Sequence, residues 1–366
     1  MTQRIPTFVP GFHDPDVVSR IPYQRLGQTD MLVSRLSFGC SSISHGVRFS
    51  PDGQVLPDDQ QVAKNIHTIH SAVKAGINYF DTSPFYGAGK SEIVLGKALS
   101  GLPRSSFYVA TKVGRNERCQ FNYSRPEVRR LVQRSLTKLQ VTYIDLVQVH
   151  DVEFAESVDV VVKETLPALE ELRKEGLIKY IGITGYPLDV LKRVIQANDP
   201  TSVRIDTILS YCRHTLFNND LLEYVQFFRD QNLGIINAAV HGMGLLTGTE
   251  LPDWHPATEA VRSACRAAIQ LCSGEADDIC NLTTAHALAS CHVDTVLTGM
   301  TTTEILQANL NVLSNGVSEG ERRVLERIQR ECMCIPSSDW EGIELRRYHC
   351  DKEEFCNMLR KLHGDA

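Results

Sequence analysis

Four side chains in this sequence could together move a proton to or from an oxygen atom: Asp81, Tyr86, Lys112 and His150. A phenol has an ordinary pKa of about 10, which is too high for ready proton exchange near neutral pH. A neighbouring ammonium such as that of Lys112 favours the phenolate, and Asp81 could hold this ammonium in an ion pair. His150 could hydrogen-bond the substrate oxygen or the phenol. Such a set polarises a carbonyl or deprotonates an alcohol, so it suits hydride transfer to or from a nicotinamide.

The local pattern predicts that these side chains meet at one edge of a sheet. Asp81, Lys112 and His150 each end a short apolar run that is typical of a buried strand. Tyr86 lies in the turn-forming residues 83–89, ahead of helical spacing over residues 90–99. Taken singly, Asp81 and Lys112 are more typical of a structural ion pair, and His150 of a buried histidine. Their coincidence at the ends of three successive strands favours a shared catalytic role, because these ends converge on one open face.

The rest of the chain repeats the strand-then-helix unit. Helical spacing is clear over residues 60–75, 125–139 and 221–230. A further helix is predicted over residues 160–175, and Pro167 must then lie in or near its first turn or kink it. We therefore predict an α/β fold, a closed (β/α)8 TIM barrel with an N-terminal hairpin over residues 23–34 and a C-terminal extension. The eight predicted strands are residues 36–39, 77–81, 107–112, 143–150, 178–184, 205–211, 234–239 and 294–298.

The predicted domain organisation is simple. Residues 1–20 are expected to form a flexible N-terminal arm, residues 21–331 the barrel, and residues 332–366 a C-terminal tail with no clear partner strand. Cys332, Cys334, Cys350 and Cys356 of this tail lack the paired C-x-x-C spacing of a zinc site, so thiols are favoured and no metal is predicted.

Composition limits the partners and the compartment. A formal net charge of −6 and a pI near 6.1 give no long-range attraction to nucleic acid or anionic lipid, which favours a small-molecule partner. No apolar stretch is long enough to span a bilayer, and the first twenty residues lack the apolar segment of a secretory signal. Eleven scattered cysteines suit a reducing compartment, so we expect a cytoplasmic protein. The oligomeric state is not indicated.

Residues 78–87, with Thr111-Lys112 and Val149-His150, resemble the aldo-keto reductase superfamily. Its members are (β/α)8 barrels that use an Asp, Tyr, Lys and His set with a nicotinamide cofactor, so the resemblance implies a catalytic role for Asp81, Tyr86, Lys112 and His150. It extends over about residues 23–313. Within the superfamily, residues 149–154, 181–189, 209–212, 242–247 and 254–257 look most like the L-galactose dehydrogenase group. That group oxidises the anomeric hydroxyl of an aldose to a lactone with NAD, and Tyr86 would then be the general base.

The resemblance also implies cofactor-binding residues. Thr184-Gly185 replaces a common Ser-Asn pair that holds the carboxamide, Ile208 replaces a common Gln, and Ala238 replaces a stacking aromatic residue. The absence of a basic residue at Thr301 favours NAD, with NADP as the alternative. The predicted cofactor-binding residues are Thr184, Gly185, His241, Gly242, Met243, Gly244, Leu245, Gly299, Thr301, Gln307 and Asn309.

Two other functions remain open. The same residues would serve an NADPH-dependent reductase of aldehydes or ketones, which the ratio of NAD to NADP affinity would distinguish. The long arm and tail, with the departures at Gly185, Ile208 and Ala238, would also suit a cofactor-sensing, non-catalytic subunit, which should co-purify with a partner. The substrate, a sugar or another carbonyl compound, would lie among the loops after the strands, with Phe85, Phe154, Tyr186 and Trp340 as candidate walls.

Overall fold

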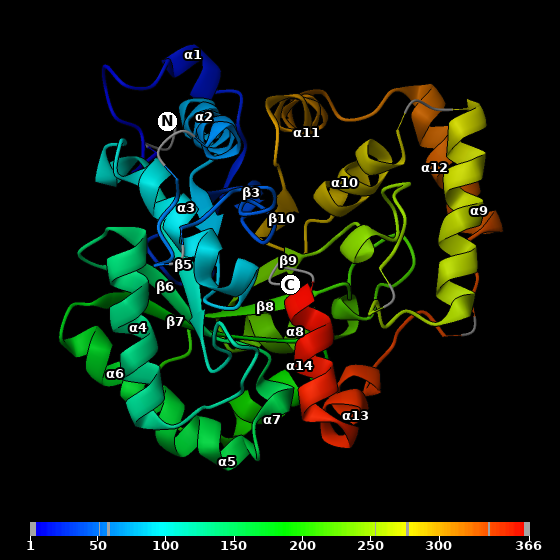
Figure 1. Cartoon of the computed structure of the whole chain (residues 1–366). Helices are drawn as coiled ribbons and strands as arrows, with labels where there is room; N and C mark the ends of the chain where they lie inside the picture. The colour runs from blue at the N-terminus through cyan, green and yellow to red at the C-terminus, as the bar shows by residue number, and fades with distance from the viewer. Residues whose placement is uncertain are drawn as a thin grey trace.

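Eight parallel strands close into a barrel in the computed structural model, which describes residues 5–50, 52–56, 59–252, 254–275, 278–335 and 337–361. Neighbours in the sheet follow the order of the chain, and the last strand pairs with the first (Figure 1). The predicted (β/α)8 barrel is therefore confirmed. Its strands are β3 (Leu36–Gly39), β4 (Tyr79–Asp81), β5 (Tyr108–Val113), β6 (Ile144–Val149), β7 (Ile178–Gly185), β8 (Thr207–Tyr211), β9 (Gly234–Ala238) and β10 (Thr295–Gly299).

Helices surround the barrel on the outside (Figure 1). Residues 125–139 form a helix because apolar side chains recur every three or four residues, and Val128, Leu131 and Val132 are buried against the strands. The main helices are α2 (Gln60–Lys74), α3 (Lys90–Leu99), α4 (Arg125–Leu139), α6 (Leu166–Lys174), α7 (Leu188–Ala197), α8 (Leu221–Asp230), α9 (Glu259–Glu275), α10 (Ile279–Ala289), α11 (Thr303–Asn315), α12 (Glu319–Glu331), α13 (Ile343–Cys350) and α14 (Lys352–Lys361).

The helix predicted over residues 160–175 is divided. A short helix, α5 (Val158–Val160), continues into a π-helical turn, η4 (Val161–Thr165), before α6 begins at Leu166. Pro167 lies in the first turn of α6. Because a proline has no N–H to donate to the preceding turn, the wider π-helical turn accommodates it without ending the helix.

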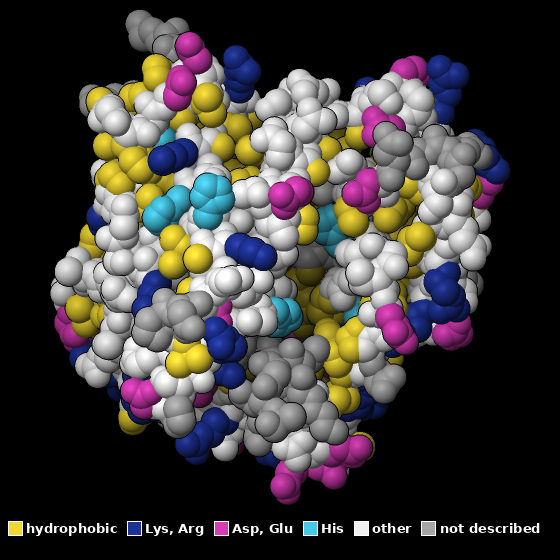
Figure 2. Space-filling view, turned by 45° about the horizontal axis from the view of Figure 1, so that its top comes forward, with side chains coloured by type: hydrophobic (Ala, Val, Ile, Leu, Met, Phe, Trp, Pro, Cys, Tyr) yellow, Lys and Arg dark blue, Asp and Glu magenta, His cyan; other side chains and the backbone are white. Residues whose placement is uncertain are grey.

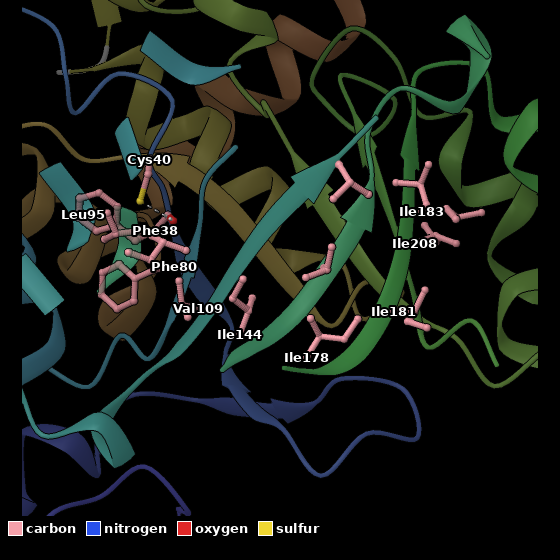
Figure 3. Close-up of a cluster of buried hydrophobic side chains, with 14 of the residues drawn as sticks. Phe38, Cys40, Phe80, Leu95, Val109, Ile144, Ile178, Ile181, Ile183 and Ile208 are labelled. Carbon is pink, nitrogen blue, oxygen red and sulfur yellow. Dashed lines mark hydrogen bonds between the residues drawn. The ribbon is translucent and has the colours of Figure 1, made fainter. Parts of the chain in front are cut away.

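The core has an outer and an inner layer. Strand residues that point outward pack against the helices, as Ile181, Ile183 and Ile208 do (Figure 3). Residues that point inward fill the barrel itself, among them Tyr79, Leu146 and Ile236. This layering places Ile208 in the helix-facing layer, so its side chain packs among apolar groups there.

An antiparallel hairpin, β1 (Tyr23–Arg25) and β2 (Leu32–Ser34), joins the inner core. Leu26, Met31 and Val33 are fully buried among the barrel residues. Its turn approaches the start of β9 so closely that a Cβ atom on Gly27 would lie 2.3 Å from the Gly234 nitrogen, and Gly27 has φ +56°. The predicted hairpin thus contributes to the core at the amino end of β9.

Both ends of the described chain contact the barrel units. A helical turn, α1 (Pro15–Val18), begins at the Asp14 cap, and Val18 is buried. Nearby, the His13 ring hydrogen-bonds the Val73 carbonyl of α2 at 3.1 Å. At the other end, α13 and α14 form a helical pair (red in Figure 1). The tail that lacked a clear partner strand is thus helical over much of its length.

Candidate active site

Asp81 and Lys112 form a buried ion pair at the carboxyl ends of β4 and β5. The Lys112 ammonium donates to the Asp81 Oδ1 atom and, at 2.8 Å, to the Thr82 carbonyl oxygen. Only 1% of Lys112 and 3% of Asp81 is exposed. Charges this deeply buried need an opposite charge to offset the loss of their hydration, and Asp81 and Lys112 are this partner for each other.

Tyr86 lies beside this ion pair, in the turn η1 (Tyr86–Gly89) that follows β4. The Lys112 Nζ atom lies 4.7 Å from the centre of the Tyr86 ring, and the two side chains are hydrogen-bonded. Burial raises the pKa of Tyr86, and Lys112 opposes that effect without overcoming it. Lys112 thus acts in the predicted direction, but the cost of burying a phenolate is larger, so the pKa of Tyr86 is raised and not lowered.

His150 follows β6 directly and completes the predicted set. Its ring stands perpendicular to the Tyr86 ring, with the centroids 5.9 Å apart, and its Nδ1 atom lies 3.2 Å from the Ser83 Oγ atom. Burial lowers the pKa of His150 well below 6.5, and the charges of Lys112 and Arg115 lower it further. The imidazole is therefore neutral at neutral pH, with one ring nitrogen that donates a hydrogen bond and one that accepts.

The structure thus brings the four predicted side chains together on the same end of the barrel. Sequence reasoning missed several groups that hold them. Gln148 pairs with Lys112 across β5 and β6, and its amide donates to the Asp81 Oδ2 atom at 2.7 Å. The Tyr123 hydroxyl bonds the carbonyl oxygens of His150 at 2.8 Å and of Asp151 at 2.6 Å. Gln148 could have been found, since it lies two residues before His150 and therefore on the same face of its strand.

A second buried ion pair lies next to His150. The Arg115 guanidinium donates to the Asp151 Oδ2 atom at 2.8 Å, and that oxygen lies 3.7 Å from the His150 Nε2 atom. Arg115 also stacks on the Phe85 ring at 3.5 Å. Both charged residues follow their strands within a few positions, which is the signal that sequence reasoning could have used.

The C-terminal helices cover part of this site. Tyr348 of α13 and Phe355 of α14 belong to one apolar cluster with Phe85 and Phe154, and Tyr86 packs against it. Trp340, just before α13, is buried and stacks on Tyr186 with ring centres 5.0 Å apart. Figure 2 shows a hollow in one face of the molecule, with hydrophobic side chains inside it. No periodicity in the sequence pointed to this packing, because it depends on contacts between distant segments.

Thr184 and Gly185 end β7, on the side of the barrel next to His150. The Thr184 hydroxyl accepts from the Asp151 N–H at 3.2 Å. A Cβ atom on Gly185 would lie 2.7 Å from the Glu153 Oε2 atom, while Glu153 Oε1 accepts from the Tyr186 N–H at 3.0 Å. Glu153 therefore occupies the space in which a side chain at Gly185 would begin.

The loop after β9 has a run of left-handed backbone conformations. Ala239, Gly242, Met243 and Gly244 have φ values of 53°, 64°, 54° and 107°. Successive residues of this kind can turn backbone N–H groups toward an anion. A Cβ atom on Gly242 would lie 2.7 Å from the Phe217 ring, so no larger residue fits there. His241 hydrogen-bonds the Cys280 carbonyl of α10 at 3.3 Å, and Leu245 is buried in the neighbouring apolar cluster.

The residues predicted after β10 are distributed around the start of α11. Gly299 is exposed, and a Cβ atom there would meet no atom within 4 Å. Thr301 precedes the Thr302 cap of α11, and Gln307 is exposed on the helix. Asn309 is mostly buried, and its side chain bonds the Ile305 carbonyl at 2.9 Å and Thr284 at 3.3 Å. Asn309 therefore joins α11 to α10, whereas Gln307 faces solvent.

The fold and the strand-end residues define an aldo-keto reductase. The model of the Aldo/keto reductase family matches residues 47–329, and the chain belongs to this family. It is 36% identical to an L-galactose dehydrogenase of Arabidopsis thaliana over 326 residues, which covers 88% of this chain and 98% of that protein. It is also 36% identical to a D-arabinose 1-dehydrogenase of Saccharomyces cerevisiae over 278 residues, covering 72% of this chain and 82% of the relative.

Solved structures support the same fold. The aldo-keto reductase AKR11C1 of Bacillus halodurans, in its holo form, aligns with a TM-score of 0.64 at 25% identity, covering 84% of this chain and 96% of that one. The resemblance read from the sequence is confirmed at the level of the family. The protein is accordingly an NAD(P)-dependent oxidoreductase with a small-molecule carbonyl or sugar substrate. Within the described residues, no helix has the length and apolar character needed to cross a membrane.

Proposed function

We propose that this enzyme oxidises the anomeric hydroxyl of an aldose, such as L-galactose, to the lactone, with NAD as the hydride acceptor and Tyr86 as the general base. The two relatives described above, an L-galactose dehydrogenase and a D-arabinose 1-dehydrogenase, support an aldose substrate. The observation that carries the proposal is the contact between Tyr86 and the buried ammonium of Lys112.

The proposed roles follow from the contacts of each side chain. The Tyr86 oxygen takes the proton of the sugar hydroxyl, and the adjacent ammonium of Lys112 stabilises the phenolate that forms. Asp81 fixes this ammonium, so it stays protonated although it is buried, and the pKa of Lys112 is raised. The neutral His150 ring can hydrogen-bond the sugar oxygen and orient it toward Tyr86.

The residues present fit a bound dinucleotide. NAD supplies the nicotinamide ring that accepts a hydride. The left-handed residues between Ala239 and Gly244 could receive the pyrophosphate on their backbone N–H groups, together with the side chains of the 241–245 loop. Thr184 and Gly185 would lie at the carboxamide of the nicotinamide. Gly185 lacks the amide side chain that is common there, so the backbone and the Thr184 hydroxyl would supply the hydrogen bonds. Gly299, Thr301, Gln307 and Asn309 would border the adenosine half.

A preference for NAD over NADP follows from charge at the start of α11. NADP carries an additional phosphate, which is usually paired with a cation. Thr301 is uncharged, and the nearest charged side chain in the first turn of α11 is the exposed carboxylate of Glu304. This carboxylate would repel the extra phosphate.

Reduction of aldehydes or ketones is a second candidate, and the raised pKa of Tyr86 favours it. A phenol that remains protonated at neutral pH is ready to donate a proton to a carbonyl oxygen, as a reductase requires. The two directions use the same residues, and they differ in which substrate the enzyme turns over.

The test is a two-direction assay of the purified chain. NAD or NADP is mixed with a panel of aldoses that includes L-galactose and D-arabinose, and formation of reduced nicotinamide is followed by absorbance. We expect turnover with at least one aldose and a higher kcat/KM with NAD. Turnover confined to NADPH with aldehydes or ketones would replace this proposal with the reductase, and silence in both directions would contradict both.

A further inference from the structure

Two cysteines from distant parts of the chain face each other beside the site. Cys119 lies in the loop between β5 and α4, and Cys356 lies on α14. The Cys356 sulfur is 3.0 Å from the Cys119 carbonyl oxygen and also hydrogen-bonds the Cys119 sulfur. Neither residue has a role in the proposed reaction.

The loop holds Cys119 in a fixed position. The Asn116 side chain accepts from the N–H groups of Arg118 at 2.9 Å and Gln120 at 3.0 Å, and the Cys119 N–H bonds the Asn116 carbonyl at 3.0 Å. Cys119 itself has φ +58°, a conformation that these hydrogen bonds maintain. The sulfur therefore has little freedom to move away from α14.

Cys119 also has the electrostatic surroundings of a reactive thiol. The hydrogen bond from Cys356 lowers the pKa of Cys119 to about 6, and although burial opposes this effect, the adjacent Arg115 adds to it. Arg115 donates to the Cys119 sulfur at 3.4 Å. The thiolate, not the thiol, is the nucleophile in cysteine oxidation, and a cation and a neighbouring thiol are what usually produce it.

A small oxidant has a route to both sulfurs. A cavity of about 660 Å³ is lined by Asn116, Cys119, Gln120, Tyr348, Lys352 and Cys356. Gln120 and Lys352 are exposed, so the cavity reaches the surface, whereas Cys119 and Cys356 are themselves buried. The cavity thus gives a small oxidant such as hydrogen peroxide a path from solvent to the two sulfurs.

We propose that Cys119 and Cys356 are a redox-active pair that closes reversibly to a disulfide in the presence of a hydroperoxide, tying α14 to the barrel. The Cys119 thiolate attacks one oxygen of the peroxide, the O–O bond breaks, and a sulfenic acid and hydroxide form. The Cys356 sulfur then attacks the Cys119 sulfur, and the S–OH bond breaks as the S–S bond forms. The departing hydroxide leaves as water with the Cys356 proton, so two thiols and one peroxide give one disulfide and two waters.

The test uses the full chain, hydrogen peroxide and peptide mass spectrometry. Trypsin should release residues 119–129 and 353–360, each with one cysteine, and we expect peroxide to link them with the loss of two hydrogen atoms. Dithiothreitol should separate them again. In Cys356→Ser, the sulfenic acid has no resolving thiol, so dimedone should label Cys119.

Cys350→Ser is the matched control, because Cys350 is exposed at the end of α13 and should not contribute to the link. The proposal is overturned if peroxide oxidises exposed Cys350 while Cys119 stays reduced, or if Cys119 is linked to a cysteine other than Cys356. The wild-type link does not depend on any variant, so a failure of Cys356→Ser to fold leaves the test decisive.

Discussion

The Gln148 side-chain amide donates a 2.7 Å hydrogen bond to the Asp81 carboxylate, at the oxygen that Lys112 does not bind. Both oxygens of a buried carboxylate are therefore satisfied by strand residues that face into the barrel. Since hydrogen bonds to charged groups contribute more than neutral ones, Gln148 should contribute to stability as well as to the position of Lys112.

We expect Gln148→Leu to lower the free energy of unfolding by about 1–3 kcal/mol, because the Asp81 Oδ2 atom then keeps only the longer, 3.4 Å hydrogen bond from the Tyr79 hydroxyl. Urea unfolding measures this difference. Gln133→Leu, on the exposed side of α4, is the control and should change stability by less than about 0.5 kcal/mol. Equal losses in the two variants would show that the Gln148 hydrogen bond contributes nothing specific.

Tyr86→Phe should reduce kcat by roughly 10²–10⁴-fold, because it removes the transferable proton and preserves the ring. The affinity for NAD, measured by quenching of protein fluorescence, should remain close to that of the wild type. Tyr224→Phe, on α8 and outside the barrel, controls for loss of a phenol in general. An unchanged kcat in Tyr86→Phe would refute the proton-transfer role.

The pH dependence should follow the phenol. Burial raises the pKa of Tyr86 above its ordinary value and Lys112 opposes this, so alcohol oxidation, which needs the phenolate, should become faster as the pH rises above neutral. His150 is neutral in this range because its pKa is lowered. The profile of kcat against pH should therefore show no further inflection near pH 6.5 from this histidine.

Removing the ion pair should move the alkaline limb. In the double variant Asp81→Asn, Lys112→Met, no buried charge is left unpaired. Lys112 lowers the pKa of Tyr86 and Asp81 raises it, and the effect of Lys112 is the larger, so its loss dominates. We expect the midpoint of the kcat–pH profile to shift to higher pH. A shift to lower pH would mean that the effect of Asp81 on the phenol outweighs that of Lys112, which would contradict the role given to Lys112.

The barrel could be predicted from the sequence because each unit carries its own local signal. The helices over residues 90–99, 125–139 and 221–230 were predicted at the residues where the structure has them, since apolar spacing and turn residues define both of their ends. The predicted site residues sit together for the same reason, because strand ends in a parallel barrel converge.

What could not be predicted depends on long-range packing. The pKa of Tyr86 reflects how completely its phenol is buried, which includes the apolar cluster formed with Tyr348 and Phe355 from the tail. The contact between Cys119 and Cys356 likewise joins segments more than two hundred residues apart. The spacing of residues within a helix or strand does not predict contacts between segments so far apart in the sequence.

Glu153 explains why glycine stands at position 185. Restoring the family's amide with Gly185→Asn alone should destabilise the protein by roughly 1–3 kcal/mol, because the new Cβ atom, 2.7 Å from a Glu153 oxygen, forces the buried carboxylate to move and give up its hydrogen bond from the Tyr186 N–H. Glu153→Ala opens this space, so the double variant should be more stable than the sum of the two single effects predicts. Thermal unfolding of all four proteins measures the coupling, and simple additivity would contradict the steric account.

Glu344 of α13 should make stability depend on pH. Burial raises the pKa of its carboxyl to about 7; Arg115 and Arg347 oppose this rise, while Asp151 and Cys119 reinforce it. Between pH 4.5, the ordinary pKa in the unfolded state, and pH 7, the folded state therefore binds more protons than the unfolded state. This group thus makes the protein less stable as the pH rises.

Glu344→Gln removes this titration. The free energy of unfolding that the variant gains over the wild type should grow from near zero at pH 4.5 to about 1–2 kcal/mol at pH 8, once solvent screening is allowed for. Glu353→Gln, exposed on α14, is the control. Urea unfolding at several pH values measures the difference, and a gain that is constant across this range would show that Glu344 is ionised in the folded protein throughout.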